Sequence, residues 1–273
     1  MTEGRPDRHP PRVRLATWNV NSLAARLPRL LAWLPEARPD VLCLQETKIA
    51  DAAFPRAELG RLGYRVASHG GGRWNGVAVV SRVGLEEPVL SFAGEPGFPQ
   101  TEARAVAATC AGVRVWSVYV PNGRSLDNPH YAFKLAWLAS LRDALAAELR
   151  AGRDRLAVCG DFNIAPTDED VWDPAEFAGS THVSEPERAA YRELLALGLR
   201  DVPPRALNGR PFTYWDYRAG MFHKGMGMRI DLALLSPALA ADVRDAYVDR
   251  DARKGTAPSD HAPLVVDLGP ATG

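Results

Sequence analysis

Short runs of apolar residues recur along this chain and restrict the folds it can adopt. Each run is four to eight residues long, and several are almost wholly apolar. Runs of this length are typical of strands, and continuous apolar character is expected where a sheet is covered on both faces. The runs span residues 13–18, 41–44, 77–80, 104–110, 113–120, 156–159, 230–235 and 264–268.

Helical patterns alternate with these strands. Apolar residues recur at helical spacing in residues 27–34, 130–150 and 187–197, and loops are predicted at 69–76, 95–101, 123–129 and 205–211. Many strands with helices on two sides predict an α/β fold in which two packed sheets are flanked by helices. We expect a single domain over residues 13–269, preceded by a disordered tail at residues 1–12.

Composition limits the class of protein. With 273 residues and 46% hydrophobic content the chain is globular, and a net charge of zero gives no overall attraction to nucleic acid. Cys43, Cys110 and Cys159 lie in apolar runs without metal-ligand spacing, so we expect buried free thiols and a reducing cytoplasm. The N-terminus does not resemble a signal peptide and no apolar run is long enough to span a membrane, which predicts a cytoplasmic protein.

Polar residues gather where the predicted strands end. Four of the seven asparagines in the chain fall in such clusters. Strand ends that converge on one rim of a sheet are a usual place for a site, and carboxylates, amides, a tyrosine and an imidazole suit metal-assisted attack on a phosphate. The clusters are Trp18-Asn19-Val20-Asn21, Gln45-Glu46-Thr47-Lys48, Tyr119-Val120-Pro121-Asn122, Gly160-Asp161-Phe162-Asn163 and Ser259-Asp260-His261.

Two of these residues favour a hard cation. Glu46 follows one buried strand and Asn19 ends another. Taken alone, Glu46 could be a solvated strand end and Asn19 a turn former. Together their oxygens suit Mg²⁺ or Mn²⁺ rather than zinc, because no nearby Cys/His pair favours a softer metal.

A second pair suits proton transfer. Asp161 and Asn163 are two residues apart on an extended chain and point to the same side. Gly160 before them permits a sharp turn or close approach of another backbone. A carboxylate beside a carboxamide can orient a water and take its proton. The alternative is an Asx-turn that caps the loop at residues 165–167.

Asp231 and His261 form a third candidate pair. A lone histidine is usually structural, but Asp231 lies in an apolar strand and an unpaired buried carboxylate costs several kcal/mol. A hydrogen bond to His261 would satisfy Asp231, fix the imidazole tautomer and raise the histidine pKa. Tyr119 and Asn122, at the end of another strand, could supply further hydrogen bonds to a phosphate.

In order and context this set of residues resembles the exonuclease III family, within the endonuclease/exonuclease/phosphatase superfamily. The resemblance extends from about Val13 to Leu268 and implies a DNase I-like four-layer sandwich with two mixed sheets. It implies a divalent-metal phosphodiesterase acting on DNA. The implied metal residues are Glu46, assisted by Asn19 and Asp260, and the implied catalytic residues are Tyr119, Asp161, Asn163, Asp231 and His261.

Four of the six residues at positions 212–217 are aromatic, and this segment discriminates between the substrate classes found in the superfamily. One interpretation is a strand that packs its aromatics into a core. In the enzymes this chain resembles, the stretch shapes a pocket for an abasic sugar, which Tyr214, Met228 and Ile230 would line here. Met228 departs from the family pattern, because these enzymes often have tryptophan at that position.

Contact with DNA must come from local charge because the total charge is zero. Arg73, Asn122 and Arg124 lie in predicted loops beside the rim, as do residues 218–224 and 253–254. Each arginine taken singly could be an ordinary solvated side chain. As a set they could contact phosphates without reading bases.

The resemblance implies a DNA repair nuclease that degrades double-stranded DNA from 3′ ends and incises DNA at abasic sites. Mg²⁺ or Mn²⁺ would be the cofactor, and we expect a monomer with no membrane and no obligate protein partner. One alternative is another phosphoesterase of the fold, of phosphoinositide phosphatase or sphingomyelinase type. Another is a catalytically silent DNA-binding relative. The sequence leaves open whether Asp161 acts as base or acid, and how many metal ions act.

Overall fold

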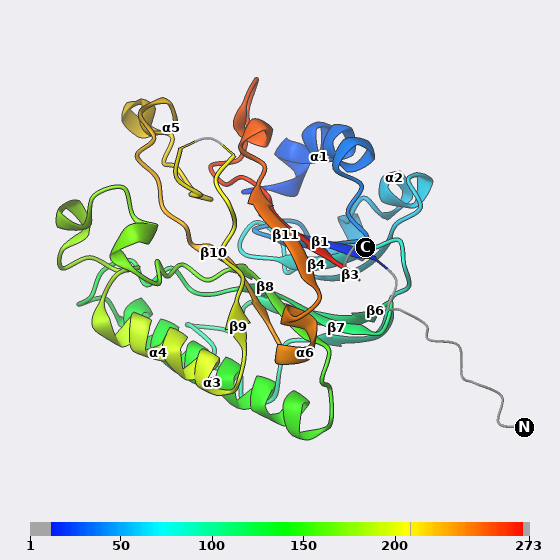
Figure 1. Cartoon of the computed structure of the whole chain (residues 1–273), viewed down its shortest axis with the longest axis horizontal. Coiled ribbons are helices and arrows are strands. Elements are labelled where there is room, and N and C mark those ends of the chain that lie inside the picture. The colour runs from blue at the N-terminus through cyan, green and yellow to red at the C-terminus, as the bar shows by residue number, and fades with distance from the viewer. Residues whose placement is uncertain (1–11, 208, 270–273) are drawn as a thin grey trace, which may run out of the picture.

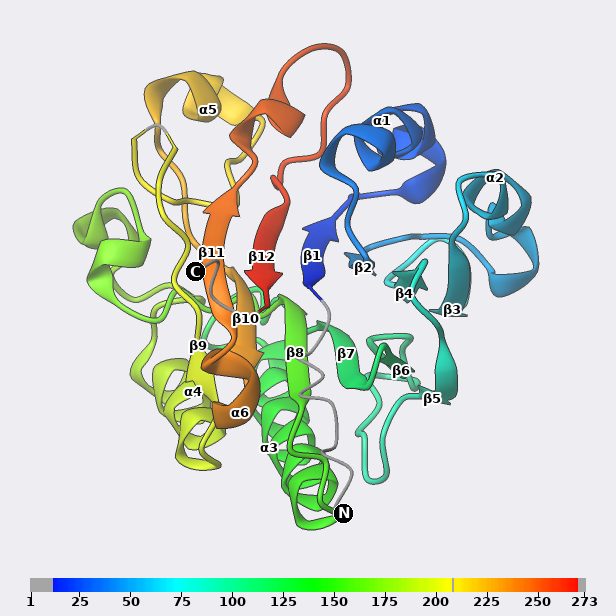
Figure 2. The same ribbon diagram turned by 45° about the vertical axis from the view of Figure 1, so that its right-hand side comes forward.

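A computed structural model describes residues 12–207 and 209–269, in which two six-stranded sheets pack face to face (Figures 1 and 2). The first sheet has the order β11 (Val243–Val248), β12 (Leu264–Leu268), β1 (Val13–Asn19), β2 (Val41–Gln45), β4 (Val77–Ser81) and β3 (Arg65–His69). The second has the order β5 (Glu86–Leu90), β6 (Ala105–Cys110), β7 (Val113–Tyr119), β8 (Leu156–Asp161), β10 (Asp231–Leu235) and β9 (Arg200–Asp201).

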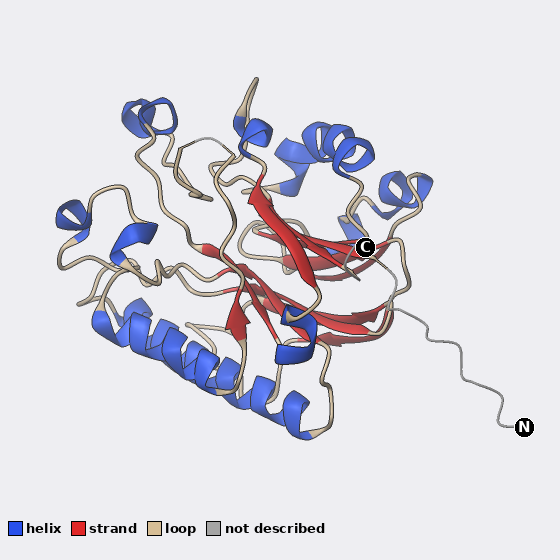
Figure 3. Ribbon diagram, viewed as in Figure 1, coloured by secondary structure: helices blue, strands red, loops and turns tan. Residues whose placement is uncertain are grey.

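Helices cover the outer face of each sheet, which gives four layers (Figure 3). On the first sheet lie α1 (Leu23–Ala37) and α2 (Arg56–Arg61), and on the second lie α3 (Pro129–Arg150) and α4 (Glu185–Ala196). Short helices α5 (Met221–Lys224) and α6 (Pro237–Ala240) lie in the connections. Within the described ranges, 3-10 turns span Asp51–Ala53, Asp168–Asp170, Pro174–Phe177, Arg218–Gly220 and Arg250–Arg253.

Each sheet contains one parallel pair, and this pairing brings chain ends together. β1 runs parallel to β2, and β7 runs parallel to β8. β10 runs antiparallel to β8, and β12 runs antiparallel to β1. The residues that end β1, β2, β7 and β8 therefore lie at the same edge as those that begin β10 and β12.

The apolar runs are explained by burial on both faces of the sheets. Cys43 of β2 and Cys159 of β8 point into the core between the sheets, whereas Leu42 and Leu44 of β2 pack outward with α1. Trp137 of α3 packs on the outer face of the second sheet. The prediction of buried free thiols is confirmed, because Cys43, Cys110 and Cys159 are all buried and unpaired.

The expected strands and helices are present within a few residues, and two sheets flanked by helices are confirmed. Four strands were not predicted, namely β3, β5, β9 and β11, and neither was α2. Helix α1 begins at Leu23, four residues before the expected start at residue 27. Of the predicted tail, residues 1–11 lie outside the described residues and Arg12 is exposed. A single domain over residues 13–269 stays a prediction.

Candidate active site

The polar residues at the strand ends meet across the two sheets. In the second sheet Asp161 pairs with Tyr119 of β7 on one side and with Asp231 of β10 on the other. In the first sheet Asn19 pairs with Gln45, the residue before Glu46. The strands β1 and β8 contact each other across the interface between the sheets. The predicted convergence on one rim is therefore present.

Gly160, the residue before Asp161, lets strand β8 lie close to strand β7. Its φ is 159°, and a Cβ atom there would lie 1.9 Å from the carbonyl oxygen of Val118 on β7. A larger residue would push β8 away from β7. Of the two alternatives left open by the sequence, a sharp turn or close approach of another backbone, the structure shows the close approach.

Two carboxylates share one amide donor at the centre of the site. The Nδ2 of Asn19 donates to Glu46 Oε1 at 2.8 Å and to Asp161 Oδ2 at 2.9 Å. The Asn19 Oδ1 accepts from the backbone N–H of Asn21 at 3.0 Å. Asn19 thus faces both carboxylates with its nitrogen, and it would have to turn its amide to offer Oδ1 to a cation.

The electrostatics of the two carboxylates differ. For Glu46, burial opposes ionisation, but Lys48 at 2.9 Å and the Asn19 amide outweigh it and lower the pKa. For Asp161, burial is the largest effect, and the charges of Asp231 and Glu46 add to it. They outweigh His261 and Asn19 and raise the pKa to about 7. The site therefore concentrates negative charge that lacks full compensation.

Asp231 and His261 form the hydrogen bond expected from the sequence. The Nδ1 of His261 lies 2.7 Å from Asp231 Oδ2, and its Nε2 lies 3.9 Å from Asp161 Oδ2. Burial alone would lower the pKa of His261, but Asp231, Asp161 and Asp260 outweigh it and raise the pKa to about 10. The imidazole is therefore a cation at neutral pH, with Nε2–H directed toward the site.

This arrangement fits a hard cation held by oxygen atoms. Single ligand atoms of Glu46, Asp161 and His261 lie within 4.8 Å of one another. A protonated imidazole cannot ligate a metal, so the carboxylates are the ligands this cluster offers. A divalent cation bound here would neutralise the charge of two carboxylates that share one neutral hydrogen-bond donor.

Asp260 lies beside this cluster rather than within it. Its Oδ1 accepts from Asn21 Nδ2 at 3.1 Å, and the Oδ1 of Asn21 accepts from Lys48 Nζ at 2.5 Å. Ser259 fixes the segment, because its Oγ donates to the Asn19 carbonyl at 2.7 Å. Asn21, Lys48 and Ser259 belong to the sequence clusters at the strand ends, but the sequence alone predicts no role for them.

Asn163 is joined to both Asp161 and Asn122. Its backbone N–H donates to Asp161 Oδ1 at 2.9 Å, which forms an Asx-turn over residues 161–163 and not one that caps residues 165–167. Its Oδ1 accepts from Asn122 Nδ2 at 3.3 Å, and its φ of 50° is in the left-handed region. Tyr119 lies nearby, and burial together with the charge of Glu46 raises the pKa of its phenol well above the usual value.

A buried ion pair that sequence reasoning missed supports these loops. Lys134 of α3 forms an ion pair with Glu187 of α4, and both side chains are fully buried. Its Nζ also donates to the carbonyl oxygens of Asn163 at 2.7 Å and Asn122 at 3.2 Å. Glu187 accepts further from Thr181, His182 and Ser184. No sequence signal marks this pair beyond a lysine and a glutamate in predicted helices.

The aromatic segment is neither a strand nor a fully exposed surface. Tyr214 makes isolated bridges to Met228 and His261, and its ring centroid lies 4.9 Å from that of His261. Met228 and Ile230 are 7% and 2% exposed and pack with Ala165 and Val171. Of this set, Tyr214 is the one in contact with His261, and the pocket for an abasic sugar stays a prediction.

Three of the predicted DNA-contacting residues lie around a hollow of about 610 Å³ beside Tyr119. The hollow is not lined by residues 218–224 and 253–254, nor by Tyr214, Met228 and Ile230. Arg73, Asn122 and Arg124 line it and all three are exposed. The structure thus places these residues together next to the site, although they do not contact the carboxylates.

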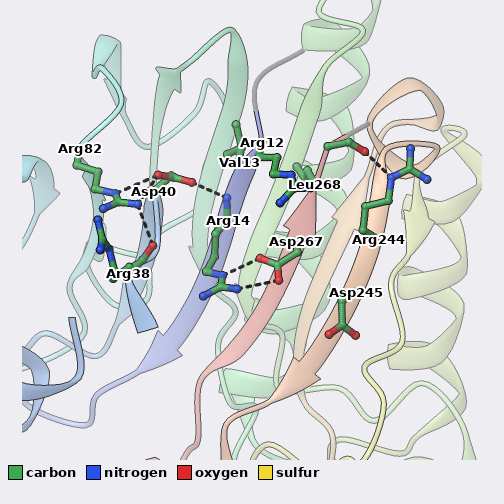
Figure 4. Close-up of a pocket in the computed structure, with 11 residues that line it drawn as sticks. Arg12, Val13, Arg14, Arg38, Asp40, Arg82, Arg244, Asp245, Asp267 and Leu268 are labelled. Atoms are coloured by element: carbon green, nitrogen blue, oxygen red, sulfur yellow. Dashed lines mark hydrogen bonds and ion pairs between the residues drawn. The ribbon is translucent and has the colours of Figure 1, made fainter. Parts of the chain in front are cut away.

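Another hollow of about 600 Å³ lies at the opposite end of β1 and β12 (Figure 4). Two of its arginines are paired, Arg14 with Asp267 and Arg82 with Asp40. The cluster of Glu46, Asp161 and His261 does not line it. We therefore assign the site to the carboxylate cluster and not to this hollow.

Comparison with known proteins agrees with this geometry. A family model described as the Endonuclease/Exonuclease/phosphatase family matches residues 16–261. Exodeoxyribonuclease III of Haemophilus influenzae is 32% identical over 267 residues, which cover 92% of this chain and 98% of that protein. A solved 3′-5′ exonuclease (NExo) from Neisseria meningitidis is 40% identical with a TM-score of 0.88, covering 93% of this chain and 99% of that one. An AP endonuclease from Archaeoglobus fulgidus is 37% identical with a TM-score of 0.86, covering 94% and 99%.

The chain therefore belongs to the endonuclease/exonuclease/phosphatase family, in its exonuclease III branch. It is a hydrolase of phosphodiester bonds, and both the family and the DNase I-like fold predicted from the sequence are confirmed. Among the described residues, the structure contains no helix whose length and hydropathy would let it cross a bilayer.

Proposed function

We propose that this protein is a divalent-metal-dependent DNA repair nuclease that degrades duplex DNA from 3′ ends and incises at abasic sites. The observation that carries the proposal is the cluster in which Asn19 joins Glu46 and Asp161, with the Asp231–His261 pair beside it. Support for DNA comes from relatives similar over nearly the whole chain, which are an exodeoxyribonuclease III and an AP endonuclease.

Glu46 is the principal residue proposed to hold Mg²⁺ or Mn²⁺, with Asp260 and a turned Asn19 assisting. When bound, the cation neutralises charge that develops on the phosphate and the leaving oxygen. Asp161 is proposed to hold the proton of the attacking water or of the leaving oxygen. Asn163 fixes that carboxylate through its backbone N–H.

His261 is proposed to donate Nε2–H to a phosphate oxygen, because Asp231 occupies Nδ1 and keeps the ring oriented. Tyr119 is proposed to contact the same phosphate. Donors held in place before the reaction stabilise charge in the transition state more than in the ground state.

The test uses end-labelled duplexes, one intact and one with a single abasic site, incubated with Mg²⁺, with Mn²⁺ or with a chelator. We expect metal-dependent trimming from the 3′ end and incision at the lesion. Asp161→Asn and His261→Ala should each lower turnover by about 10²–10³-fold with unchanged circular dichroism. Near-normal cleavage by either variant would contradict the assigned roles, and no cleavage of either duplex by the wild type would contradict the function.

Two further expectations belong with this proposal. The three buried free thiols support a reducing compartment such as the cytoplasm. Sedimentation of the purified chain tests the expected monomer.

A further inference from the structure

An exposed indole, that of Trp74, lines the hollow beside Tyr119. Trp74 is 68% exposed, whereas Trp18, Trp137 and Trp215 are almost completely buried. It lies in the glycine-rich segment at residues 70–76, and its side chain contacts the guanidinium of Arg73 at 5.3 Å from the ring centroid. An aromatic side chain this exposed is not explained by core packing.

The backbone holds this segment at a fixed place relative to Glu46. The N–H of Lys48 donates to the Asn75 carbonyl at 2.9 Å, and the N–H of Thr47 donates to the Gly76 carbonyl at 3.1 Å. A Cβ atom on Gly76 would lie 2.2 Å from Thr47 Oγ1, so the two chain segments are in close contact. Trp74 is therefore anchored to the residues that directly follow the principal metal-ligand candidate.

The hollow is also positively charged. Arg73 and Arg124 line it, and in the described part of the chain neither guanidinium is ion-paired with a carboxylate. Arg104 also lines the hollow, but it is paired with Glu102 and lies over the Tyr119 ring at 4.7 Å. Free cations beside an exposed aromatic ring are the combination that binds single-stranded nucleic acid, because the cations hold phosphates and the ring stacks on a base.

We propose that this hollow is a subsite for an unpaired nucleotide next to the scissile bond, with the base stacked on Trp74 and the adjoining phosphates held by Arg73 and Arg124. The inference rests on the proposed nuclease function and names a substrate class within it. A base inside a duplex has both faces covered by its neighbours, so only a flipped, mismatched, frayed or single-stranded base can use the indole. The preferred substrates are therefore DNA ends or nicks with unpaired nucleotides.

Binding without cleavage provides the first test. Fluorescence anisotropy in the presence of a chelator compares a blunt duplex with the same duplex carrying a short 3′ or 5′ single-stranded extension. Trp74→Ala should weaken binding of an extended duplex by about 5- to 100-fold more than it weakens binding of the blunt duplex. Trp74→Phe keeps an aromatic ring and should retain most of the affinity.

The control is Leu62→Ala, which truncates another exposed apolar residue, 38% exposed and outside this hollow. It should change neither affinity. Equal effects of Trp74→Ala on blunt and extended duplexes, or no effect on either, would overturn the subsite.

Cleavage kinetics with Mg²⁺ provide the second test. Trp74→Ala should raise KM for the extended duplex more than it lowers kcat. If the wild type cleaves no DNA, the proposed function fails, and the anisotropy measurement still decides whether the subsite exists. If the wild type cleaves DNA and Trp74→Ala binds both duplexes as tightly as wild type, only the subsite is wrong.

Discussion

Single side chains in this site serve more than one partner, so substitutions have effects beyond their own contacts. Asp231 is an example. Its carboxylate is completely buried and orients His261 through a hydrogen bond. Asp231→Asn keeps the volume but removes the charge that orients and stabilises the imidazolium. We expect kcat to fall by about 10–100-fold or more, as when a partner that orients a catalytic group is lost. Steady-state turnover on a labelled duplex measures this.

The control for that experiment shows that the Asp231→Asn protein is still folded. Urea unfolding of Asp231→Asn should remain a cooperative transition. Wild-type turnover by a folded Asp231→Asn protein would show that Asp231 is only a structural partner of the histidine.

Gly160 carries a second prediction at the residue scale. A Cβ atom at this position would meet the Val118 carbonyl at 1.9 Å, and backbone atoms cannot yield as a flexible side chain can. Gly160→Ala should destabilise the protein by about 3 kcal/mol or more, or prevent folding. Urea unfolding measures the change.

Gly60 offers the matched control. It lies in α2, and a Cβ there would meet no atom within 4 Å. Gly60→Ala should be neutral or should stabilise by about 0.5–1 kcal/mol, because alanine has the higher helix propensity. A Gly160→Ala protein as stable as wild type would mean that β7 and β8 are not held as closely as described.

At the scale of elements, the strands that sequence reasoning missed all lie at sheet edges. β11 and β3 end the first sheet, and β5 and β9 end the second. An edge strand has a solvated side and carries fewer apolar residues, so its pattern resembles that of a loop. All five residues of β5 are exposed, and β9 has only two residues. The central strands were predictable because burial on both faces required apolar side chains.

Proximity to an apolar run also distinguishes the site residues that could be predicted from the sequence from those that could not. Asn19, Glu46, Asp161 and His261 follow or precede apolar runs, which marks them in the sequence. Lys134 acts on the carbonyl oxygens of Asn122 and Asn163, and backbone acceptors leave no trace in residue types. Its role depends on how α3 and α4 pack, which only the structure shows.

The ion pair between α3 and α4 predicts a pH-dependent stability. Burial opposes ionisation of Glu187, but Lys134, Ser184 and Thr181 outweigh it and lower its pKa below the ordinary value of 4.5. A carboxyl with a lowered folded-state pKa contributes stability above its unfolded pKa, and this contribution is lost as pH falls through the folded value. Glu187→Gln removes that contribution while keeping the side-chain volume.

Glu187→Gln should therefore be less stable than wild type at pH 7, by about 3–5 kcal/mol if Lys134 stays charged. The difference should shrink as pH falls below the ordinary glutamate pKa of 4.5. Urea unfolding of both proteins from neutral to acid pH measures the two curves. Parallel curves would show that Glu187 is not ionised in the folded protein.

At the scale of the whole molecule, a chain with a net charge of zero has to bind an anionic polymer through local charge. Without a bound cation the acidic cluster repels DNA, so exposed basic side chains near the site, among them the arginines around the hollow, have to supply the attraction. Arg73 and Arg124 have the required exposure and position. Replacing both with alanine should weaken DNA binding on all sequences alike, since phosphate contacts carry no base information.

The quantity that tests this is the salt dependence of binding. Each phosphate contact releases condensed counterions, so loss of one contact lowers the slope of log K against log salt by about 1. The double variant Arg73→Ala/Arg124→Ala should lower the slope by about 2, measured by anisotropy with the duplex that carries a single-stranded extension and with chelated metal. Arg192→Ala in α4 is the control, because Arg192 is paired with Glu185 outside the hollow. A double variant with the wild-type slope would place the phosphate contacts elsewhere on the protein.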